Sequence, residues 1–424
     1  MNLLIWVFIL CLFVIGYFFE NGISCEKIKF PLLTYTFLLF YHDYLFINVS
    51  YYLGVENIVF SSSWRESVLV VLFFICFFGK KIAFLSNAEM KIILFSSFFV
   101  VLGVVSSIFI SNGSLRDTII IGKGYIYPFL FICTIIILPA RCFKIERMCN
   151  LFFYIIILPN FIFGIYEYFF VKVLNDIWFY KPLLQSGNIF AYYNHFRDGD
   201  VRTNGFFVGT LSYGITGFCS FMFFFILRQR RYSYVKILIS LIMVYFTHTR
   251  IFYVGILFFL AMYYLHICMK NKKIKGWVAF SSIFIAFILV LVLLPYITQE
   301  ASAIGRISQW ENAISLLLNY PIGQGFSSIG LSGDNRADSQ IIDLIRIYGL
   351  FSISLFYYFI KVVTFYWNNS VSRYKNNVNS LPYLSIFSFL FVIFFQSLVN
   401  VPIFYFMLLL AFKSEVIKRE AYYA

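Results

Sequence analysis

Arginine residues in the polar segments of the chain are the best candidates for chemistry. A guanidinium group presents its N–H donors as a rigid fork that matches the oxygens of phosphate or pyrophosphate, and it stays charged in a partly buried cleft. These residues therefore suit a site for an anionic, lipid-linked substrate. Five arginines fall in such segments: Arg197, Arg202, Arg250, Arg306 and Arg336.

Two of these arginines stand in short polar motifs beside apolar stretches. Arg202 belongs to Val201–Phe207 (VRTNGFF), in which Gly205 permits a tight backbone turn. Arg250 ends the motif Thr247–Arg250 (THTR), between two closely connected apolar stretches. A charge at membrane depth costs about 2.5–3.5 kcal/mol unless it faces a polar cavity. An arginine that only extends to the membrane surface would fit the same pattern.

A helical pattern surrounds Arg306. Between Ile304 and Asn319, apolar residues recur on one face while polar residues lie away from it, which predicts an amphipathic helix at a membrane surface. The helix is expected to end at Tyr320–Gly325 (YPIGQG), because proline and glycine stop a helix and turn the chain. A purely structural surface helix would look the same. The predicted apolar face consists of Ile307, Trp310, Ile314 and Leu317.

Polar residues also open the next apolar stretch. Four of them fall within the first turns of a helix that is expected to cross lipid, and burying so many is costly unless they line a wet cavity. A capping role for Asp338 at the helix start is the simpler alternative. The four residues are Asp338, Gln340, Asp343 and Arg346.

Composition indicates what positions these side chains. The 424 residues are 61% hydrophobic and 12% charged, against about 45–50% and about 25% in ordinary soluble proteins. Apolar stretches of about 20 residues, the length that spans a bilayer, recur from Asn2 to Phe412. The sequence therefore predicts an all-α, polytopic integral membrane protein, with residues 1–424 forming a single transmembrane domain. We expect the first stretch, Leu3 to Phe19, to be a retained span rather than a signal peptide.

The distribution of basic residues predicts the orientation. Short loops rich in Lys and Arg stay in the cytoplasm, and the net charge of +14 is spread over such loops rather than gathered on one face that could bind nucleic acid. Residues Leu381 to Phe412 are divided into two spans by Asn400 and Pro402. About twelve spans (11–13) result. Those best defined are 92–111, 118–138, 151–172, 206–227, 236–249, 251–269, 277–297 and 338–365.

This topology leaves two large segments on the outer side, residues 173–205 and 298–337, and these are where chemistry is expected. The chain contains neither a Walker-type nor a dinucleotide-binding glycine motif, so ATP coupling is not expected. None of its eight cysteines forms a C-x-x-C pair. We therefore expect no metal and no cofactor.

The order of these motifs resembles that of the polytopic O-antigen polymerases of the Wzy type, which are related to the O-antigen ligases. The resemblance covers roughly residues 200 to 350 and rests on five signals. They are Arg202–Phe206 after a long outward segment, Thr249-Arg250 between close spans, Gly305-Arg306-Ile307 with Trp310, Tyr320–Gly325, and a polar helix start leading to Tyr348-Gly349-Leu350.

The resemblance implies a GT-C-like fold and the transfer of a glycan from undecaprenyl pyrophosphate to another lipid-linked repeat unit. The reaction would take place at the periplasmic face of the bacterial inner membrane. Membrane lipids and a chain-length regulator protein would be further partners, and nucleic acid would not.

The resemblance also implies roles for individual residues. Arg202, Arg250 and Arg306 would hold the pyrophosphate leaving group and offset its developing charge. Asp338 would activate the acceptor hydroxyl, with His195 and Asp343 as competitors for that role. The ligases carry a histidine where this chain has Asp338, which favours a polymerase. The remaining substrate-binding candidates are Arg197, Arg336 and Trp310.

Three other functions fit part of the pattern. An O-antigen ligase is the nearest enzymatic alternative. A flippase or other transporter of lipid-linked sugar would also use outward arginines, but it predicts ionisable groups deep in many spans and pseudo-symmetric halves. A membrane scaffold without chemistry would leave the arginines replaceable.

Overall fold

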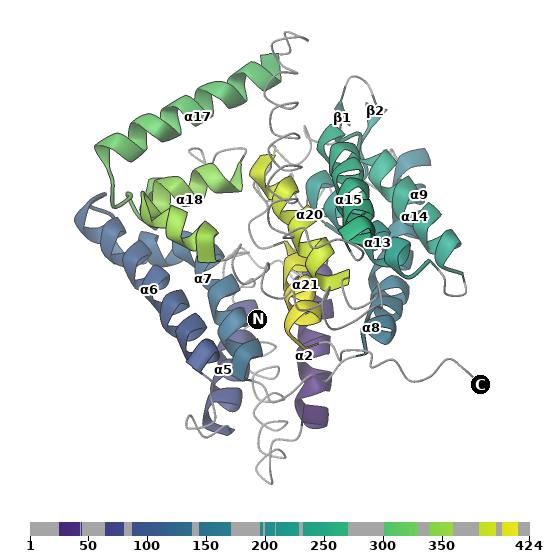
Figure 1. Ribbon diagram of the computed structural model, residues 1–424, viewed down its shortest axis with the longest axis horizontal. Coiled ribbons are helices and arrows are strands. Elements are labelled where there is room, and N and C mark those ends of the chain that lie inside the picture. The colour runs from purple at the N-terminus through teal and green to yellow at the C-terminus, as the bar shows by residue number, and fades with distance from the viewer. Residues whose placement is uncertain are drawn as a thin grey trace, which may run out of the picture. The chain divides into compact units, whose positions relative to one another are not determined.

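The computed structural model is helical, with a single pair of two-residue strands, throughout the part of the chain that it describes (Figure 1). The prediction of an all-α chain is confirmed for this part. The described residues are 25–42, 44, 64–79, 87–137, 144–170, 196–197, 200–207, 209–228, 232–269, 301–329, 339–358, 381–395 and 401–413. The predicted spans at Leu3–Phe19 and 277–297 lie outside them.

Two helical stretches are long and apolar enough to cross a membrane: Met90–Phe109 and Ile145–Phe169. The first lies in α6 (Asn87–Phe109). The second runs without interruption through α8 (Ile145–Phe152), the π-helical turn η2 (Phe153–Ile157) and α9 (Leu158–Phe169). Other apolar helices in the described residues are shorter. The count of about twelve spans stays a prediction.

The chain packs as two compact units. The first comprises Met1–Lys91, Leu130–Tyr253 and Val401–Val416, and the second comprises Ile92–Phe129, Val254–Asn400 and Ile417–Ala424. Helices α7 (Leu115–Ile137) and α15 (Arg250–Met269) each contribute to both units. This division concerns packing, and the single transmembrane domain stays a prediction.

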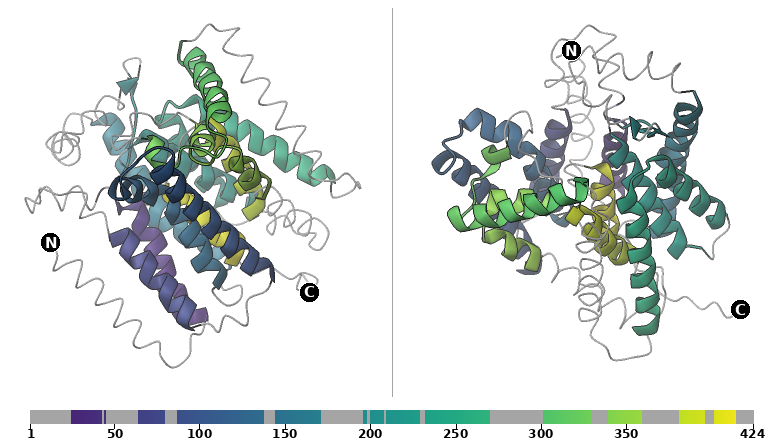
Figure 2. Two further views of the ribbon diagram at one scale, coloured as in Figure 1. Left: turned by 90° about the vertical axis from the view of Figure 1, so that its left-hand side faces the viewer. Right: turned by 90° about the horizontal axis from the view of Figure 1, so that it is seen from above.

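Helix α13 (Thr210–Ile226) forms the centre of the first unit and is buried on nearly all sides. It lies alongside α14 (Ser233–Phe246), and small residues allow the close approach, with the Ser240 Oγ donating to the Ser220 Oγ at 2.7 Å. Around this pair, the Phe152 ring stacks on Phe406 of α21 (Pro402–Lys413) at 4.6 Å. Helices α2 (Cys25–Phe40) and α5 (Trp64–Gly79) run side by side in the same unit (Figure 2).

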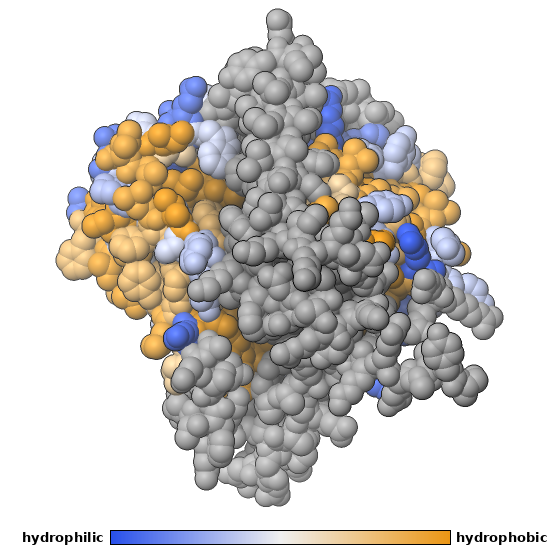
Figure 3. Space-filling model, in the orientation of Figure 1, coloured by the Kyte–Doolittle hydropathy of each residue, from blue (hydrophilic) through white to orange (hydrophobic). Residues whose placement is uncertain are grey.

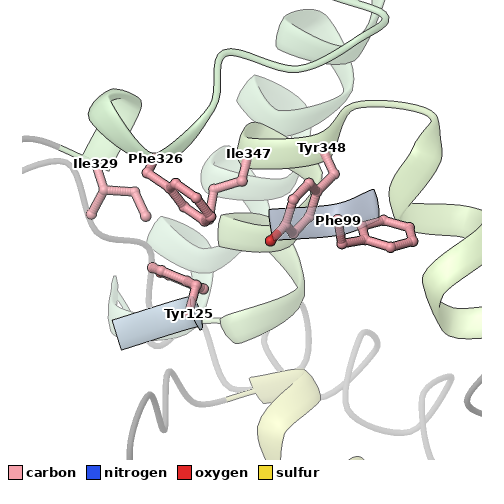
Figure 4. Close-up of a cluster of buried hydrophobic side chains, with 6 residues drawn as sticks. All are labelled: Phe99, Tyr125, Phe326, Ile329, Ile347 and Tyr348. Carbon is pink, nitrogen blue, oxygen red and sulfur yellow. The ribbon is translucent and has the colours of Figure 1, made fainter. Parts of the chain in front are cut away.

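An aromatic cluster forms the core of the second unit (Figure 4). Phe326, in the short helix η4 (Phe326–Ile329), fits against α6 and α7 where Gly103 and Gly122 leave room for its ring. It stacks on Tyr125 at 5.9 Å. Tyr348, at the end of α18 (Gln340–Tyr348), meets Phe99 edge to face at 5.0 Å. The last apolar region splits into α20 (Leu381–Phe395) and α21, as the Asn400 and Pro402 break predicts.

Helix α17 (Ala301–Asn319) ends where the sequence predicts, just before Tyr320. On the predicted apolar face, Trp310 and Leu317 are half-buried and Ile314 is 57% exposed, and the role of this face at a membrane surface stays a prediction. Ala313 is buried, because its small side chain lets α17 approach Ile342 of α18, with Trp310 packed beside them. The α17–α18 pair is seen in Figure 1.

The helix within the predicted span 338–365 is interrupted, because α18 stops at Tyr348 and residues 351–358 form a separate helical stretch. Gly349 has a φ of +55°, and a Cβ there would lie 2.2 Å from the Pro321 carbonyl oxygen. The backbone at this break pairs with the Pro321–Gly325 turn: Gln324 N–H donates to Arg346 O, Gly325 N–H to Ile347 O, and Leu350 N–H to Pro321 O. The motif Tyr320–Gly325 and the motif Tyr348-Gly349-Leu350 are therefore hydrogen-bonded to each other.

Large apolar side chains line one exposed face of α6. They recur three or four residues apart, so they share one side of the helix. In Figure 3, apolar residues cover much of the described surface in view. The exposed residues on α6 are Leu94, Phe98, Val101, Val105 and Phe109.

Candidate functional site

The segment Val201–Phe207 is anchored to α9 by side chains that accept backbone hydrogen bonds. The Glu167 Oε2 accepts the N–H groups of Asn204 and Gly205 at 3.0 and 2.9 Å. Asn160 lies seven residues before Glu167, on the same face of α9, and its Oδ1 accepts the Phe206 N–H at 2.9 Å. Both anchoring side chains are fully buried. Three consecutive donors of the motif are therefore satisfied by one face of α9.

Gly205 is required at the centre of this anchor. Its φ of +60° is strained for any residue with a Cβ. A Cβ there would also lie 2.7 Å from both the Asn160 Oδ1 and the Tyr213 ring. The glycine lets the backbone turn closely enough for its neighbours to donate to α9.

On its other side, the same segment binds the turn between α14 and α15. The Thr203 N–H donates to the Phe246 carbonyl at 3.1 Å. The Arg202 guanidinium donates from Nε to the Thr247 carbonyl and from Nη2 to the Thr249 Oγ1, both at 2.9 Å. Two polar motifs separated by about forty residues in the sequence therefore form one structure.

Positive charge accumulates at this end of the first unit. Arg202 is held between the end of α14 and the beginning of α15, and Arg250 is the first residue of α15, where it is exposed. A helix N-terminus carries a partial positive charge, so a cation there is unfavourable by about 0.3–1 kcal/mol. Arg202, Arg250 and this helix end together suit an anionic ligand. We call these features, with the Thr247–Arg250 turn, the arginine site.

The turn contains a second unusual feature, His248. Its φ of +48° is uncommon for a residue other than glycine. The imidazole is flanked by the rings of Tyr168 and Tyr245, with centroids at 6.5 and 5.6 Å. Its Nε2 is buried and has no hydrogen-bond partner within the described part of the chain. Thr203 Oγ1 and Tyr213 Oη, close to the same motif, are likewise buried without a partner there.

The other sequence-predicted residues belong to the second unit or fall outside the description. Asp343 is fully buried on α18, where its Oδ2 accepts a hydrogen bond from the Tyr125 hydroxyl at 3.3 Å. Trp310 is half-buried beside Ala313. Arg306 lies in α17, but its side chain is outside the described residues. The N-cap of α18 is Ser339, whose Oγ accepts the Ile341 N–H at 3.3 Å.

Three predicted residues lie wholly outside the description: His195, Arg336 and Asp338. Arg197 is described as backbone only, in the strand β1 (Phe196–Arg197), which pairs with β2 (Asp200–Val201) so that Arg197 faces Asp200 in register. The arginine site thus joins the motif of Arg202 to the turn that precedes Arg250. The roles predicted for all these residues stay predictions.

Sequence reasoning missed the anchoring residues Glu167 and Asn160. Both lie inside the predicted apolar span 151–172, and an ionisable residue inside such a span is itself a signal of function or of specific pairing.

A buried cation, Lys236, lies near the start of α14. It is 6% exposed, and its Nζ donates to the Asn150 Oδ1 at 2.6 Å. The ammonium also lies 4.8–5.1 Å from three aromatic ring centroids, those of Phe153, Tyr154 and Phe224. We call this arrangement the lysine cage. The ammonium group therefore finds its hydrogen-bond acceptor and its aromatic neighbours within the protein.

No family model, curated protein or solved structure matches the chain. Within the described residues, no group of three or more His, Cys, Asp or Glu side chains is placed to hold a metal ion. The chemistry of the arginine site therefore has to be inferred from the residues that form it.

Proposed function

We propose that the protein is a polytopic glycosyltransferase of the bacterial inner membrane that polymerises undecaprenyl-pyrophosphate-linked oligosaccharide repeat units into O-antigen or a related surface polysaccharide. The observation that carries the proposal is the arginine site. It fixes Arg202 by two hydrogen bonds of 2.9 Å and places Arg250 at the adjoining helix start. An enzyme that releases polyprenyl pyrophosphate needs such a cationic group at the leaving oxygen.

The rigidity of Arg202 supports this role. A donor that is already oriented loses little conformational freedom when charge develops on the leaving group, so its electrostatic stabilisation is realised in the transition state. Glu167 and Asn160 contribute by fixing the backbone that carries it. Arg306, Arg197 and Arg336 are proposed to add charge around the oligosaccharide pyrophosphate, and Trp310 to contact sugar.

The membrane location is supported by the two long apolar helices and by the exposed apolar face of α6. A face of five large apolar side chains is unusual on a surface in contact with water and suits lipid. We propose about twelve spans, a GT-C-like arrangement, and an active site that faces the periplasm. From the sequence alone, Asp338 is the expected base, with His195 as a competitor, and both lie outside the described residues. Asp343 is a weaker candidate, since it is fully buried and binds Tyr125.

A deletion strain tests the proposal. When its lipopolysaccharide is separated by gel electrophoresis, loss of a polymerase should leave lipid A core that bears one repeat unit. Complete loss of repeat units would identify a ligase or a flippase instead, and an unchanged ladder would contradict all three functions.

Complementation of that strain tests the site. Plasmids that carry Arg202→Ala, Arg250→Ala, Arg306→Ala or Asp338→Ala are compared with wild type at equal protein levels in the membrane. If all four variants restored full-length chains, the proposed site would be wrong. The exposed Glu311→Ala is the matched control and should restore the full ladder.

A further inference from the structure

The proposed transfer requires a group that takes the proton of the acceptor hydroxyl, and the arginine site contains a side chain of the right chemistry. Histidine is the side chain best suited to accept and return a proton near neutral pH. From the geometry of the turn between α14 and α15, and on the basis of the proposed function, we propose that His248, in place of Asp338, is this proton acceptor.

The position of His248 relative to Arg202 is the first observation. The two hydrogen-bond acceptors of the Arg202 guanidinium are Thr247 O and Thr249 Oγ1, the residues on either side of His248. Arg250 follows directly at the start of α15. The imidazole is thus attached to the backbone turn on which the guanidinium is fixed.

The second observation is that the basic nitrogen is not engaged. Nε2 is buried and has no partner within the described part of the chain, although the residue as a whole is half-exposed. A buried imidazole nitrogen is ordinarily hydrogen-bonded. A hydroxyl group that hydrogen-bonds to Nε2 therefore displaces no partner among the described residues.

The backbone supplies the third observation. His248 holds a left-handed conformation, which costs about 1 kcal/mol or more in a residue with a Cβ. Glycine or asparagine would adopt this conformation with less strain, and strained residues of this kind cluster at functional sites. The same conformation at Tyr232, which precedes α14, provides an internal control for the turn itself.

Two buried carboxylates of the described residues are already engaged in hydrogen bonds. Glu167 Oε2 accepts two backbone N–H groups, and Asp343 Oδ2 accepts the Tyr125 hydroxyl. Both side chains are fully buried. An acceptor hydroxyl could reach either only by displacing these bonds.

The step balances as follows. The acceptor hydroxyl oxygen forms a bond to the anomeric carbon of the donor glycan, and its proton moves to Nε2 of His248, with the Nδ1–H tautomer as the starting form. The bond between the anomeric carbon and the pyrophosphate oxygen breaks, and its electron pair leaves with undecaprenyl pyrophosphate. The imidazolium then returns the proton to water or to the departing pyrophosphate. Arg202 and Arg250 offset the charge on that leaving group.

Kinetics of the purified full-length protein in proteoliposomes test this role. The substrate is the polyprenyl-pyrophosphate-linked repeat unit extracted from the host strain that lacks the gene. His248→Asn and His248→Gly both tolerate the left-handed backbone, so both should fold. We expect kcat to fall by about 100-fold or more in each, with KM changed little. Added imidazole should restore part of the turnover of His248→Gly, because the small base can occupy the space of the missing ring.

The controls separate this inference from the proposed function. Tyr232→Gly should keep wild-type turnover and should not respond to imidazole. Wild-type protein that makes no polymer would refute the proposed function itself. Active wild type with full kcat in His248→Asn, a change in KM alone, or no recovery of His248→Gly with imidazole would each overturn the role of His248.

Discussion

The arginine site and the lysine cage lie at opposite ends of α14 and hold a cation in different ways. Lys236 donates to Asn150 and is surrounded by three aromatic rings, and its side chain is almost wholly removed from solvent. Arg202 remains half-exposed and is held by two hydrogen bonds, and its acceptor Thr249 directly precedes a second arginine, Arg250, which is exposed. The lysine is thus enclosed by the protein, whereas the two arginines are accessible to solvent.

This difference indicates which end is built to bind an external anion. A cation enclosed by rings and an amide contributes to packing and to local stability. Arginines accessible at a helix N-terminus can bind an anion from solution. We therefore expect substitutions at the arginine site to affect turnover and those at the lysine cage to affect mainly stability.

The largest effect is expected from Glu167→Ala, which removes the anchor of the arginine site. Two buried backbone donors, Asn204 N–H and Gly205 N–H, would lose their acceptor, which should lower the free energy of unfolding by about 2–6 kcal/mol. Thermal unfolding in detergent and the polysaccharide ladder both report this loss. Glu167→Gln keeps one acceptor oxygen and should lose less. If Glu167→Ala were as stable as wild type, the anchor would have no energetic importance.

Arg202→Lys should have the next largest effect, and on turnover rather than on folding. Lysine keeps the charge but cannot donate to Thr247 O and Thr249 Oγ1 in the planar geometry of the guanidinium. We expect a loss of about 100-fold in kcat with a small change in melting temperature. Steady-state kinetics in proteoliposomes measure this. Turnover close to wild type would mean that charge alone suffices at this position.

A pair of glycine substitutions tests the backbone of the arginine site. Gly205→Ala combines a left-handed φ with a Cβ only 2.7 Å from two neighbours, so we expect a destabilisation of about 2–4 kcal/mol. Gly209→Ala is the matched control, since its φ is −133° and nothing lies within 4 Å of its Cβ. Equal melting temperatures for the two variants would show that the anchor tolerates displacement.

The smallest effect is expected at the lysine cage. Lys236→Met keeps most of the side-chain volume among the three rings and loses the hydrogen bond to Asn150, so stability should change by about 1 kcal/mol or less. The polysaccharide ladder should be unchanged. Lys236→Ala, which empties the cage, should melt at a lower temperature than Lys236→Met. A loss of polymer in Lys236→Met at normal protein level would make the lysine cage functional and end the contrast.

Hydropathy predicted the helices of the first unit well, because a span is a property of consecutive residues. The predicted span 206–227 became α13 (Thr210–Ile226), and 236–249 became α14 (Ser233–Phe246). The break after Tyr348 was not predicted. It depends on the pairing of Gly349 and Leu350 with the Pro321–Gly325 turn, a long-range contact that a hydropathy window cannot detect.

The candidate site was predictable only in part. The types and positions of Arg202 and Arg250 indicated anion chemistry, but nothing in the sequence joins the two motifs. That joining depends on hydrogen bonds from Arg202 to Thr247 and Thr249 and on the anchoring by Glu167. The left-handed backbone of His248 likewise follows from the geometry of the turn rather than from its residue type.

The most direct measurement is the fate of the repeat-unit lipid when it is given, as the sole substrate, to purified wild-type protein in vesicles. Chain elongation on polyprenyl pyrophosphate is followed by gel and mass spectrometry. The proposed polymerase should produce a ladder of two or more repeat units, and Arg202→Lys should produce almost none. Movement of the lipid to the opposite leaflet without elongation, or elongation that is equal in wild type and Arg202→Lys, would contradict the proposal.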